Sequence, residues 1–468
     1  MRQQIKWVSP TPHQVFQRNL HDQASIAFSV QVAGGIKNGR LEVRTSCTSW
    51  KACGLIEGHE ECLTGTVENL TTGEHTLYVR IVDGEGAELL EKCSLGPIFV
   101  GDLWILAGQS NMEGCGRLID VEAAQAGVSC FYLGDRWDIA AEPLHWALES
   151  HDPVHWKNWM PYRSRSELNE AIRRDRVLGS GLGMAFGKEL LLHSGVPTGL
   201  VMAASGGTSM SEWDPELKHL EGGSLYGAML RIVEAAGGQV KGCLWYQGES
   251  DATEEAAEKY AERMRRFVSC LRQDLGDASL PFIYVQLGPV YTQLGLELAW
   301  PEERAWNRIQ NEQLLLEAEL AHVALVPAID MLLDDFIHLG SASLKELGRR
   351  VAATVLNKVY HLTAGSSGPR LSAAAWTNGS RTGLKLSFTG LNGGFQLVDR
   401  PFGFSLMSEG VAIAHKAKLT EDRRGILLCL AIAAPEGCTL WHGKGLNPTV
   451  NLKDQSGYPL PVWGPIPV

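Results

Sequence analysis

Five continuous apolar runs, separated by helix-like segments, constrain the fold of this chain more than any other feature. The runs are IFVGDLWILAG, TGLVMAAS, KGCLWYQG, PFIYVQLG and HVALVPAID, between residues 98 and 330. Amphipathic stretches lie at 181–195, 224–237, 256–276, 308–321 and 341–362. Strands that are apolar on both faces and alternate with such helices are typical of a parallel sheet covered on both sides. The sequence therefore predicts an α/β domain in its middle.

The segments on either side of this region have a different pattern. Short stretches that alternate apolar and polar residues between Gly, Asn and Asp turns come before it, and similar short strands follow TAGSSGP at 363–369. Such patterns are typical of β-sandwiches. We predict three domains: an N-terminal β-sandwich-like domain over 1–98, the α/β domain over 99–364 and a C-terminal β domain over 365–468.

Composition narrows the function classes. The chain has 53 acidic and 42 basic residues among 468, a net charge of -11, which argues against nucleic acid and anionic membrane as partners. It has no run of 18 apolar residues, so we expect no membrane span. The first residues lack an apolar signal core, so we expect a cytoplasmic protein, or a secreted one if a leader was removed. Whether it forms a homo-oligomer stays open.

The ten cysteines are spread thinly and form no Cys-x-x-Cys pair, so we expect no thiolate zinc site and no other metal or cofactor. Four of them, Cys47, Cys53, Cys62 and Cys93, could form disulfides in an exported protein. Free thiols are the expectation for a reducing cytosol.

Polar residues follow four of the five apolar runs, where each predicted strand ends. In an open α/β sheet, ligands bind at the carboxyl ends of the strands. A core does not require polar groups there, so this pattern indicates a site. The residues concerned are Gly108, Gln109, Ser110 and Asn111, then Gly206, Gly207 and Thr208, then Gln247, Gly248, Glu249, Ser250 and Asp251, and finally Asp335 and His338.

Ser110, His338 and Asp335 are the catalytic candidates. A serine becomes a nucleophile when a base removes its proton, and a carboxylate keeps a histidine base in the right tautomer. Asp335 precedes His338 by three residues and can reach the imidazole if the turn curls back. A second Asp-x-x-His pair, Asp152 and His155, lies in an irregular loop with no strand before it. We therefore favour Asp335 and His338.

The oxyanion that forms during attack on an ester needs donors already in place. The candidates are the backbone amide of Ser110, an amide of Gly206 or Gly207, and the side-chain amide of Gln247. Glycine suits a backbone that a ligand approaches closely. Simpler alternatives are that Ser110 is a turn residue and that Gln247 only ties down a loop. Taken together, the groups predict acyl transfer to water.

Five spaced blocks resemble the sialate O-acetylesterase and acetylxylan esterase branch of the SGNH hydrolases. They are GQSNMEG, GGTSMSEWDP, SLYGAML, LWYQGESDA, and DDFIHLG followed by LGRRVA, in order over residues 99–357. The resemblance implies a flavodoxin-like three-layer α/β/α fold and metal-independent deacetylation of sugars. It implies Ser110 as nucleophile, His338 as base, Asp335 as its partner, and the same oxyanion donors. Gln310 departs from the arginine usual in this branch, which leaves a helix-surface or substrate contact in doubt.

Contacts to the substrate are predicted at Gln109, Trp213 and Glu249, although Glu249 could instead orient Gln247 or a loop. Four tryptophans crowd one loop and could stack on a sugar ring or pack locally: Trp137, Trp146, Trp156 and Trp159. A site for sialic acid should offer a cation to its carboxylate. The candidates for that role are Arg117, Arg163 and Arg165.

The sequence thus predicts a serine-type carbohydrate O-acetylesterase that forms an acetyl-Ser110 intermediate. Its substrate would be an acetylated xylo-oligosaccharide or an O-acetyl sialic acid. Two alternatives stay open: a broad acyl esterase on non-sugar substrates, which a wide apolar pocket would favour, and a non-catalytic carbohydrate-binding protein on a hydrolase scaffold.

Overall fold

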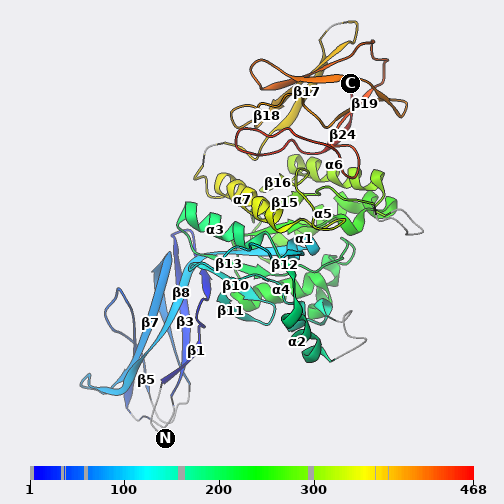
Figure 1. The fold of residues 1–468 in the computed structure, drawn as a ribbon. Helices are drawn as coiled ribbons and strands as arrows, with labels where there is room; N and C mark the ends of the chain where they lie inside the picture. The colour runs from blue at the N-terminus through cyan, green and yellow to red at the C-terminus, as the bar shows by residue number, and fades with distance from the viewer. Residues whose placement is uncertain are drawn as a thin grey trace.

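The computed structural model of the chain consists of three parts that follow one another (Figure 1). It describes residues 5–32, 36, 38–56, 62–156, 164–292, 300–363, 365–377 and 379–468. A β part at the N-terminus joins a central α/β part, and a second β part follows at the C-terminus.

The N-terminal part packs two sheets against each other. Its strands are β1 (Ile5–Ser9), β2 (Val15–Gln17), β3 (Gln23–Val32), β4 (Gly39–Thr45), β5 (Lys51–Ile56), β6 (Cys62–Thr71), β7 (Gly73–Val82) and β8 (Glu88–Gly108). One sheet has the order β1-β3-β6, and the other joins β5, β4, β7 and the first half of β8. Inward-facing residues such as Phe28, Val30, Val79 and Ile81 form the core between them.

Strand β8 connects this part to the centre of the molecule. Its first half pairs with β7, and its second half, from Asp102 onward, pairs with β13 and β14 of the central sheet. The predicted boundary at 98/99 therefore falls within one continuous strand.

The central sheet confirms the predicted α/β fold. All five apolar runs form strands: β8, β13 (Thr198–Met202), β14 (Gly242–Tyr246), β15 (Phe282–Gln286) and β16 (Val323–Pro327). Their order is β13-β8-β14-β15-β16 and all are parallel, the arrangement of a flavodoxin-like sheet. Two further strands extend the sheet beyond β13: β10 (Val128–Tyr132) and antiparallel β11 (Arg136–Ile139).

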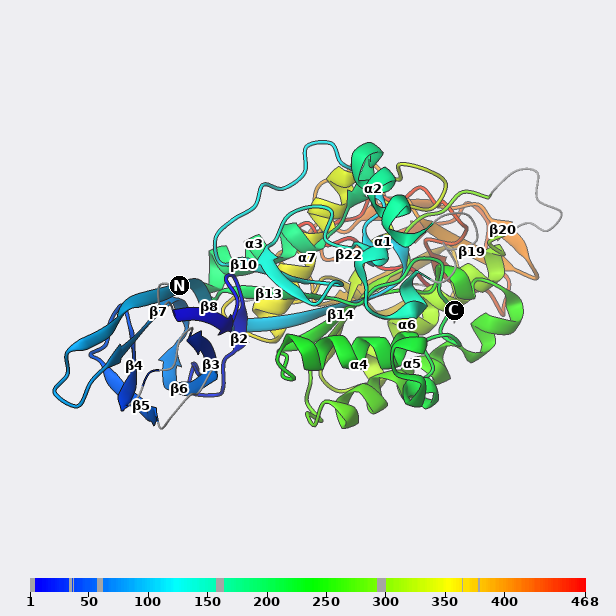
Figure 2. The ribbon, with the colours of Figure 1, turned by 90° about the horizontal axis from the view of Figure 1, so that it is seen from below.

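Helices cover both faces of this sheet, as Figure 2 shows. On one face α3 (Gly183–Ser194) packs against α7 (Ser341–Lys358), and on the other lie α4 (Leu225–Ala236) and α5 (Glu254–Asp274), with α6 (Glu303–Glu319) against α5. The hydroxyls of Ser224 and Thr253 cap α4 and α5 by accepting a backbone N–H of the first turn. No helix among the described residues is both long and apolar enough to cross a membrane.

Shorter elements shape the loops at the carboxyl edge of the sheet. These are α1 (Ser110–Glu113), β9 (Gly116–Arg117), η1 (Ala147–Glu149), η2 (Pro153–His155), α2 (Arg165–Asp175), β12 (Leu178–Ser180), η4 (Pro215–Gly223) and η5 (Glu249–Asp251). The ten cysteines, all within the described residues, are unpaired.

The C-terminal part packs two four-stranded sheets around its own core. Its strands are β17 (Arg370–Trp376), β18 (Gly383–Thr389), β19 (Phe404–Ser408), β20 (Val411–Ile413), β21 (Lys416–Leu419), β22 (Gly425–Cys429), β23 (Thr439–His442) and β24 (Trp463–Pro467). One sheet has the order β17-β18-β22-β21 and the other β20-β19-β23-β24.

Candidate active site

Ser110 stands at the carboxyl edge of the sheet because of a tight turn at the end of β8. Gly108 has φ +125°, and a Cβ at this position would lie 2.1 Å from the carbonyl oxygen of Tyr246 in the adjacent strand. Only glycine fits such a close approach at positive φ. The next residue, Gln109, donates its N–H to that same carbonyl at 2.8 Å. The strand therefore ends abruptly, and Ser110 begins α1 just beyond it.

His338 and Asp335 lie on the loop between β16 and α7. Asp335 Oδ2 is 2.7 Å from His338 Nδ1, so the turn does curl back as predicted. Asp335 Oδ1 accepts the backbone N–H groups of Ile337 at 2.8 Å and of His338 at 2.6 Å. Partial burial opposes ionisation, but these hydrogen bonds lower the pKa of Asp335 below its usual value. The carboxylate is thus stabilised in its charged form beside the imidazole.

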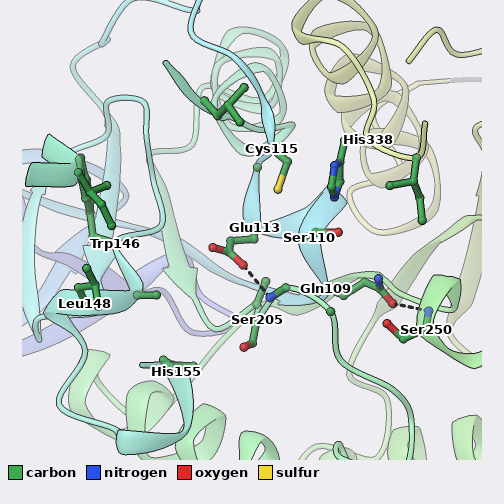
Figure 3. Close-up of a pocket in the computed structure, with 18 of the residues that line it drawn as sticks. Gln109, Ser110, Glu113, Cys115, Trp146, Leu148, His155, Ser205, Ser250 and His338 are labelled. Atoms are coloured by element: carbon green, nitrogen blue, oxygen red, sulfur yellow. Dashed lines mark hydrogen bonds between the residues drawn. The ribbon is translucent and has the colours of Figure 1, made fainter. Parts of the chain in front are cut away.

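Ser110 and His338 line one cavity of about 620 Å³, a volume typical of small-molecule sites. Figure 3 shows the His338 imidazole directed toward the side chain of Ser110. Since Nδ1 of His338 is held by Asp335, Nε2 is the nitrogen left to face the serine. The structure brings the three predicted catalytic side chains together at one edge of the sheet.

Asn111 ties the two loops of this site to each other. Its Nδ2 donates to Glu249 Oε1 at 2.8 Å and to the carbonyl oxygen of Ile337 at 3.3 Å. Its Oδ1 accepts the N–H of Leu339 at 3.0 Å. The two residues that flank His338 are therefore hydrogen-bonded to the residue that follows Ser110. Glu249, predicted to bind substrate, is 1% exposed and instead supports Asn111.

The two glycines after β13 differ in their hydrogen bonds. Gly206 donates its N–H to Glu113 Oε2 at 2.7 Å. Gly207 lines the cavity, and its N–H has no acceptor within the described part of the chain. Of the two, the geometry favours Gly207 as an oxyanion donor, beside the N–H of Ser110 in the first turn of α1.

The structure does not favour Gln247 as the third donor. Gln247 is fully buried and lies outside the residues that line the cavity. Its Nε2 already donates to the carbonyl oxygen of Thr208 at 3.0 Å and to Asp251 Oδ2 at 2.6 Å. Both N–H groups of the amide are thereby used to hold the loop, which was the simpler alternative for this residue.

Gln109 offers an amide donor in its place. Its Oε1 accepts the N–H of Ser250 at 3.2 Å and the N–H of Gly248 at 3.4 Å. These contacts fix the orientation of the amide, and its Nε2 has no acceptor among the described residues. Figure 3 shows this nitrogen on the side of the amide nearer Ser110.

Trp213 does not line the site, which contradicts its predicted contact with substrate. Its side chain is 0% exposed and packs edge-on against Trp245, with ring centroids 5.2 Å apart. Its indole N–H donates to Thr208 Oγ1 at 3.0 Å. Trp213 is therefore a core residue that supports the Gly206–Gly207 turn from behind.

Of the three tryptophans of the Trp-rich loop that the structure describes, one lines the cavity. Trp146 lines the cavity, whereas Trp137 belongs to the core and Trp156 lies outside the lining. Trp159 lies outside the described residues. His155 also lines the cavity, but Asp152 binds Arg231 through both carboxylate oxygens and does not orient His155.

Of the cations predicted for a sialic acid carboxylate, the two that the structure describes, Arg117 and Arg165, do not line the cavity. Arg117 lies outside its lining, and Arg163 outside the described residues. Arg165 donates to the carbonyl oxygens of Leu148 and Ser150. Among the described residues, Arg176 is the one Arg or Lys whose side chain lines the cavity.

Several lining residues were not singled out from the sequence. Glu113 follows Ser110 by three residues in the quoted GQSNMEG block, and helical spacing places both on one side of α1. Apart from Trp146, which was one of the predicted platforms, local pattern gives no comparable signal for the apolar walls, which come from distant segments. These walls are formed by Trp146, Leu148, Ile172, Leu178, Trp300, Phe336 and Ile337.

Gln310, where the resemblance leads one to expect arginine, is buried and far from substrate contact. Its Nε2 donates to the carbonyl oxygen of Leu287 at 2.9 Å, and it lies outside the cavity lining. The substitution therefore affects packing of α6 against the sheet. In the described residues, no group of three or more His, Cys, Asp and Glu side chains is arranged to hold a metal ion.

Comparisons with known proteins agree with the fold and show the family. Residues 100–357 match the family model described as carbohydrate esterase, sialic acid-specific acetylesterase. A probable carbohydrate esterase of Arabidopsis thaliana is 33% identical over 233 residues, which are 43% of this chain and 78% of that protein. A crystal structure described as a novel carbohydrate acetylesterase from Xanthomonas citri has a similar fold, with a TM-score of 0.65 and 20% identity over 97% of both chains. The chain belongs to the carbohydrate esterase family of the sialic acid-specific acetylesterase type.

Proposed function

We propose that this protein is a serine-type carbohydrate O-acetylesterase that uses Ser110, His338 and Asp335. The observation that carries the proposal is the Asp335–His338 hydrogen bond of 2.7 Å beside Ser110 in one cavity. A paired histidine facing a serine at the edge of an α/β sheet is what acyl transfer requires. The family supports an ester of a carbohydrate as the substrate.

The proposed reaction begins when Ser110 Oγ attacks the acetyl carbonyl and His338 Nε2 takes its proton. The oxyanion that results is stabilised by N–H groups of Ser110, Gly207 and Gln109. His338 then returns the proton to the departing sugar oxygen, which leaves acetyl-Ser110. A water molecule, deprotonated by His338, attacks this ester, and acetate leaves with regeneration of Ser110.

The substrate would be an acetylated xylo-oligosaccharide or an O-acetyl sialic acid. Arg176 offers one cation to a carboxylate, but two of its N–H groups already donate to the carbonyl oxygens of Leu178 and His145. Burial opposes its charge and lowers its pKa despite the nearby Glu113. The cavity therefore does not single out an acidic sugar, and the two substrates must be compared directly.

A broad acyl esterase is a second candidate, because one side of the cavity is apolar. Trp300 and Phe336 pack edge to face with ring centroids 6.3 Å apart, and Leu148 and Ile172 line the same cavity. Such walls suit a longer acyl chain or an aromatic alcohol as well as a sugar face.

The test is acetate release from acetylated xylo-oligosaccharide and 9-O-acetyl sialic acid, with 4-nitrophenyl acetate and 4-nitrophenyl octanoate for comparison. We expect one of the two sugars to have the highest kcat/KM, and Ser110→Ala to lower it by roughly 10³-fold or more. Higher kcat/KM for the octanoate would favour the broad esterase. Equal release by Ser110→Ala and the unaltered protein would refute the nucleophile, and no release from any ester would favour a binding protein.

A further inference from the structure

The carboxyl group of Glu113 lies in the active-site cavity and has no part in the mechanism above. Its Oε2 accepts the N–H of Gly206 at 2.7 Å, drawn as a dashed line in Figure 3. Its other oxygen has no partner among the described residues, and Figure 3 shows it directed away from Gly206 and toward the side of Trp146. One oxygen of the carboxyl is thus available to a ligand.

This carboxyl lies close to the reacting serine. A Cβ placed on Gly206 would be 3.0 Å from Glu113 Oε2 and 3.6 Å from Ser110 Cβ, so both side chains flank the same glycine. An acetyl ester at Ser110 brings with it the neighbouring atoms of its alcohol. Groups next to the ester oxygen are therefore candidates to meet the carboxyl.

The surroundings of Glu113 favour a second hydrogen-bond donor to its carboxyl group. Burial raises the pKa of Glu113, an effect that the Gly206 N–H and the charge of Arg176 only partly oppose. The walls across the cavity are aromatic and aliphatic side chains, among them Leu148 and Trp300. Glu113 is partly exposed to the cavity, so a ligand that displaces water from its free oxygen must supply a hydrogen bond to avoid a cost in free energy.

We propose that Glu113 recognises a free hydroxyl on the carbon next to the acetylated one, and that this hydroxyl donates to Glu113 Oε1. The inference rests on the proposed function and defines its substrate class further, as sugars acetylated at one of two neighbouring hydroxyls. Carboxylate oxygens are strong acceptors, and a site built to bind a hydroxyl discriminates against the analogue that lacks it. Sugars with both neighbours acetylated are therefore poor substrates until one acetyl group has been removed.

The experiment compares two substrates and three proteins. The substrates are a monoacetylated methyl xyloside with a free neighbouring hydroxyl and its deoxy analogue, in which hydrogen replaces that hydroxyl. The proteins are the unaltered chain, Glu113→Met, which is similar in size but forms no such bond, and Glu113→Gln. In the glutamine variant the amide oxygen accepts the Gly206 N–H, and the NH₂ group can donate to the oxygen of the substrate hydroxyl. We expect kcat/KM of the unaltered protein to be at least about tenfold higher for the hydroxyl-bearing substrate. The ratio falls to about one in Glu113→Met and is largely kept in Glu113→Gln.

If Glu113 serves only to hold Gly206, Glu113→Met lowers kcat/KM equally for both substrates. An unchanged ratio of the two kcat/KM values in this variant would therefore refute the inference. Equal kcat/KM for both substrates in the unaltered protein would also refute it while leaving the esterase intact. Absence of acetate release from every sugar would instead refute the proposed function. If Glu113→Met does not fold, binding can be compared in place of catalysis. The Kd of each substrate is measured for Ser110→Ala and for the double variant Ser110→Ala with Glu113→Ala. We expect Ser110→Ala to bind the hydroxyl-bearing substrate more tightly than the deoxy analogue, and the double variant to bind both equally.

Discussion

Asp335 Oδ2 lies 2.7 Å from Nδ1 of His338, while Asp335 Oδ1 accepts the backbone N–H of the same histidine. One carboxylate thus holds both the ring and the main chain of the residue. This double contact is possible because the two residues are three apart in a tight loop. It orients the imidazole with Nε2 toward Ser110 before any substrate binds.

Asp335→Asn should lower kcat by roughly 10²- to 10⁴-fold with little change in KM. The amide keeps the size of the side chain and its acceptor oxygen, but it removes the charge that stabilises an imidazolium. The variant is compared with the unaltered protein by initial rates on 4-nitrophenyl acetate and by thermal unfolding. A large loss of Tm would mean that the effect is on folding of the loop, and an unchanged kcat would contradict the role of Asp335.

Asn111→Asp should lower kcat by roughly 10- to 100-fold through misplacement of His338. The aspartate can still accept the N–H of Leu339, but it loses the donor to Glu249 and the carbonyl of Ile337. It also sets a second carboxyl against Glu249, whose pKa is already raised by burial. Glu249→Gln is the matched control, because its amide oxygen can still accept from Asn111, and we expect it to keep most of the activity. Similar rates for both variants would contradict the positioning role of Asn111.

Gln109 and Gln247 should give different defects. Gln109→Glu keeps an acceptor for the Ser250 N–H but removes the donor near Ser110, so kcat should fall by about 10²-fold with Tm nearly unchanged. Gln247→Ala leaves the carbonyl of Thr208 without this donor and leaves Asp251 Oδ2 with the Met210 N–H alone, which should cost about 1–3 kcal/mol of stability. Rates and denaturant unfolding of both variants test this. The opposite result, a stable but inactive Gln247→Ala, would restore the original prediction for Gln247.

Glu142→Gln should change how stability depends on pH. Glu142 Oε1 accepts the N–H of Gly181 at 3.1 Å, and burial raises the pKa of this carboxyl from 4.5 to about 8. The folded state therefore binds a proton that the unfolded state releases. This contribution is fully present below pH 4.5 and is lost as the pH rises to about 8.

The glutamine variant lacks this titration, so it should gain stability relative to the unaltered protein as the pH rises from 5 to 9, by about 4 kcal/mol. Urea unfolding of both proteins at several pH values measures the difference. A difference that is constant across this range would show that Glu142 does not titrate in it.

The sequence by itself determined the central fold and the acid–base pair of the site. Continuous apolar runs indicate burial on both faces, and a parallel sheet covered by helices is the arrangement in which such strands alternate with helices. The flavodoxin-like form of that sheet was implied by the resemblance to the SGNH hydrolases. The relation of Asp335 to His338 is also local, since residues three apart in a turn meet without help from distant segments. The candidate nucleophile followed from the same logic, because Ser110 comes two residues after Gly108, which ends the strand.

The tertiary structure decided which polar groups face the cavity and which face the core. Gln109 and Gln247 both follow strand ends, and only the packing of the loops directs one amide into the cavity and the other toward Asp251. Trp213 follows the glycine turn closely yet is buried behind it, since its environment is set by Trp245 of a neighbouring strand.

Apart from Trp146, the walls of the cavity were likewise not predictable from local pattern, because Arg176, Trp300 and Phe336 meet there from segments far apart in the chain. Periodicity and spacing describe a residue's relation to its sequence neighbours, so they indicate strands, helices and turns. The direction of a side chain at the edge of a sheet depends on contacts between distant segments, and only the folded chain supplies those.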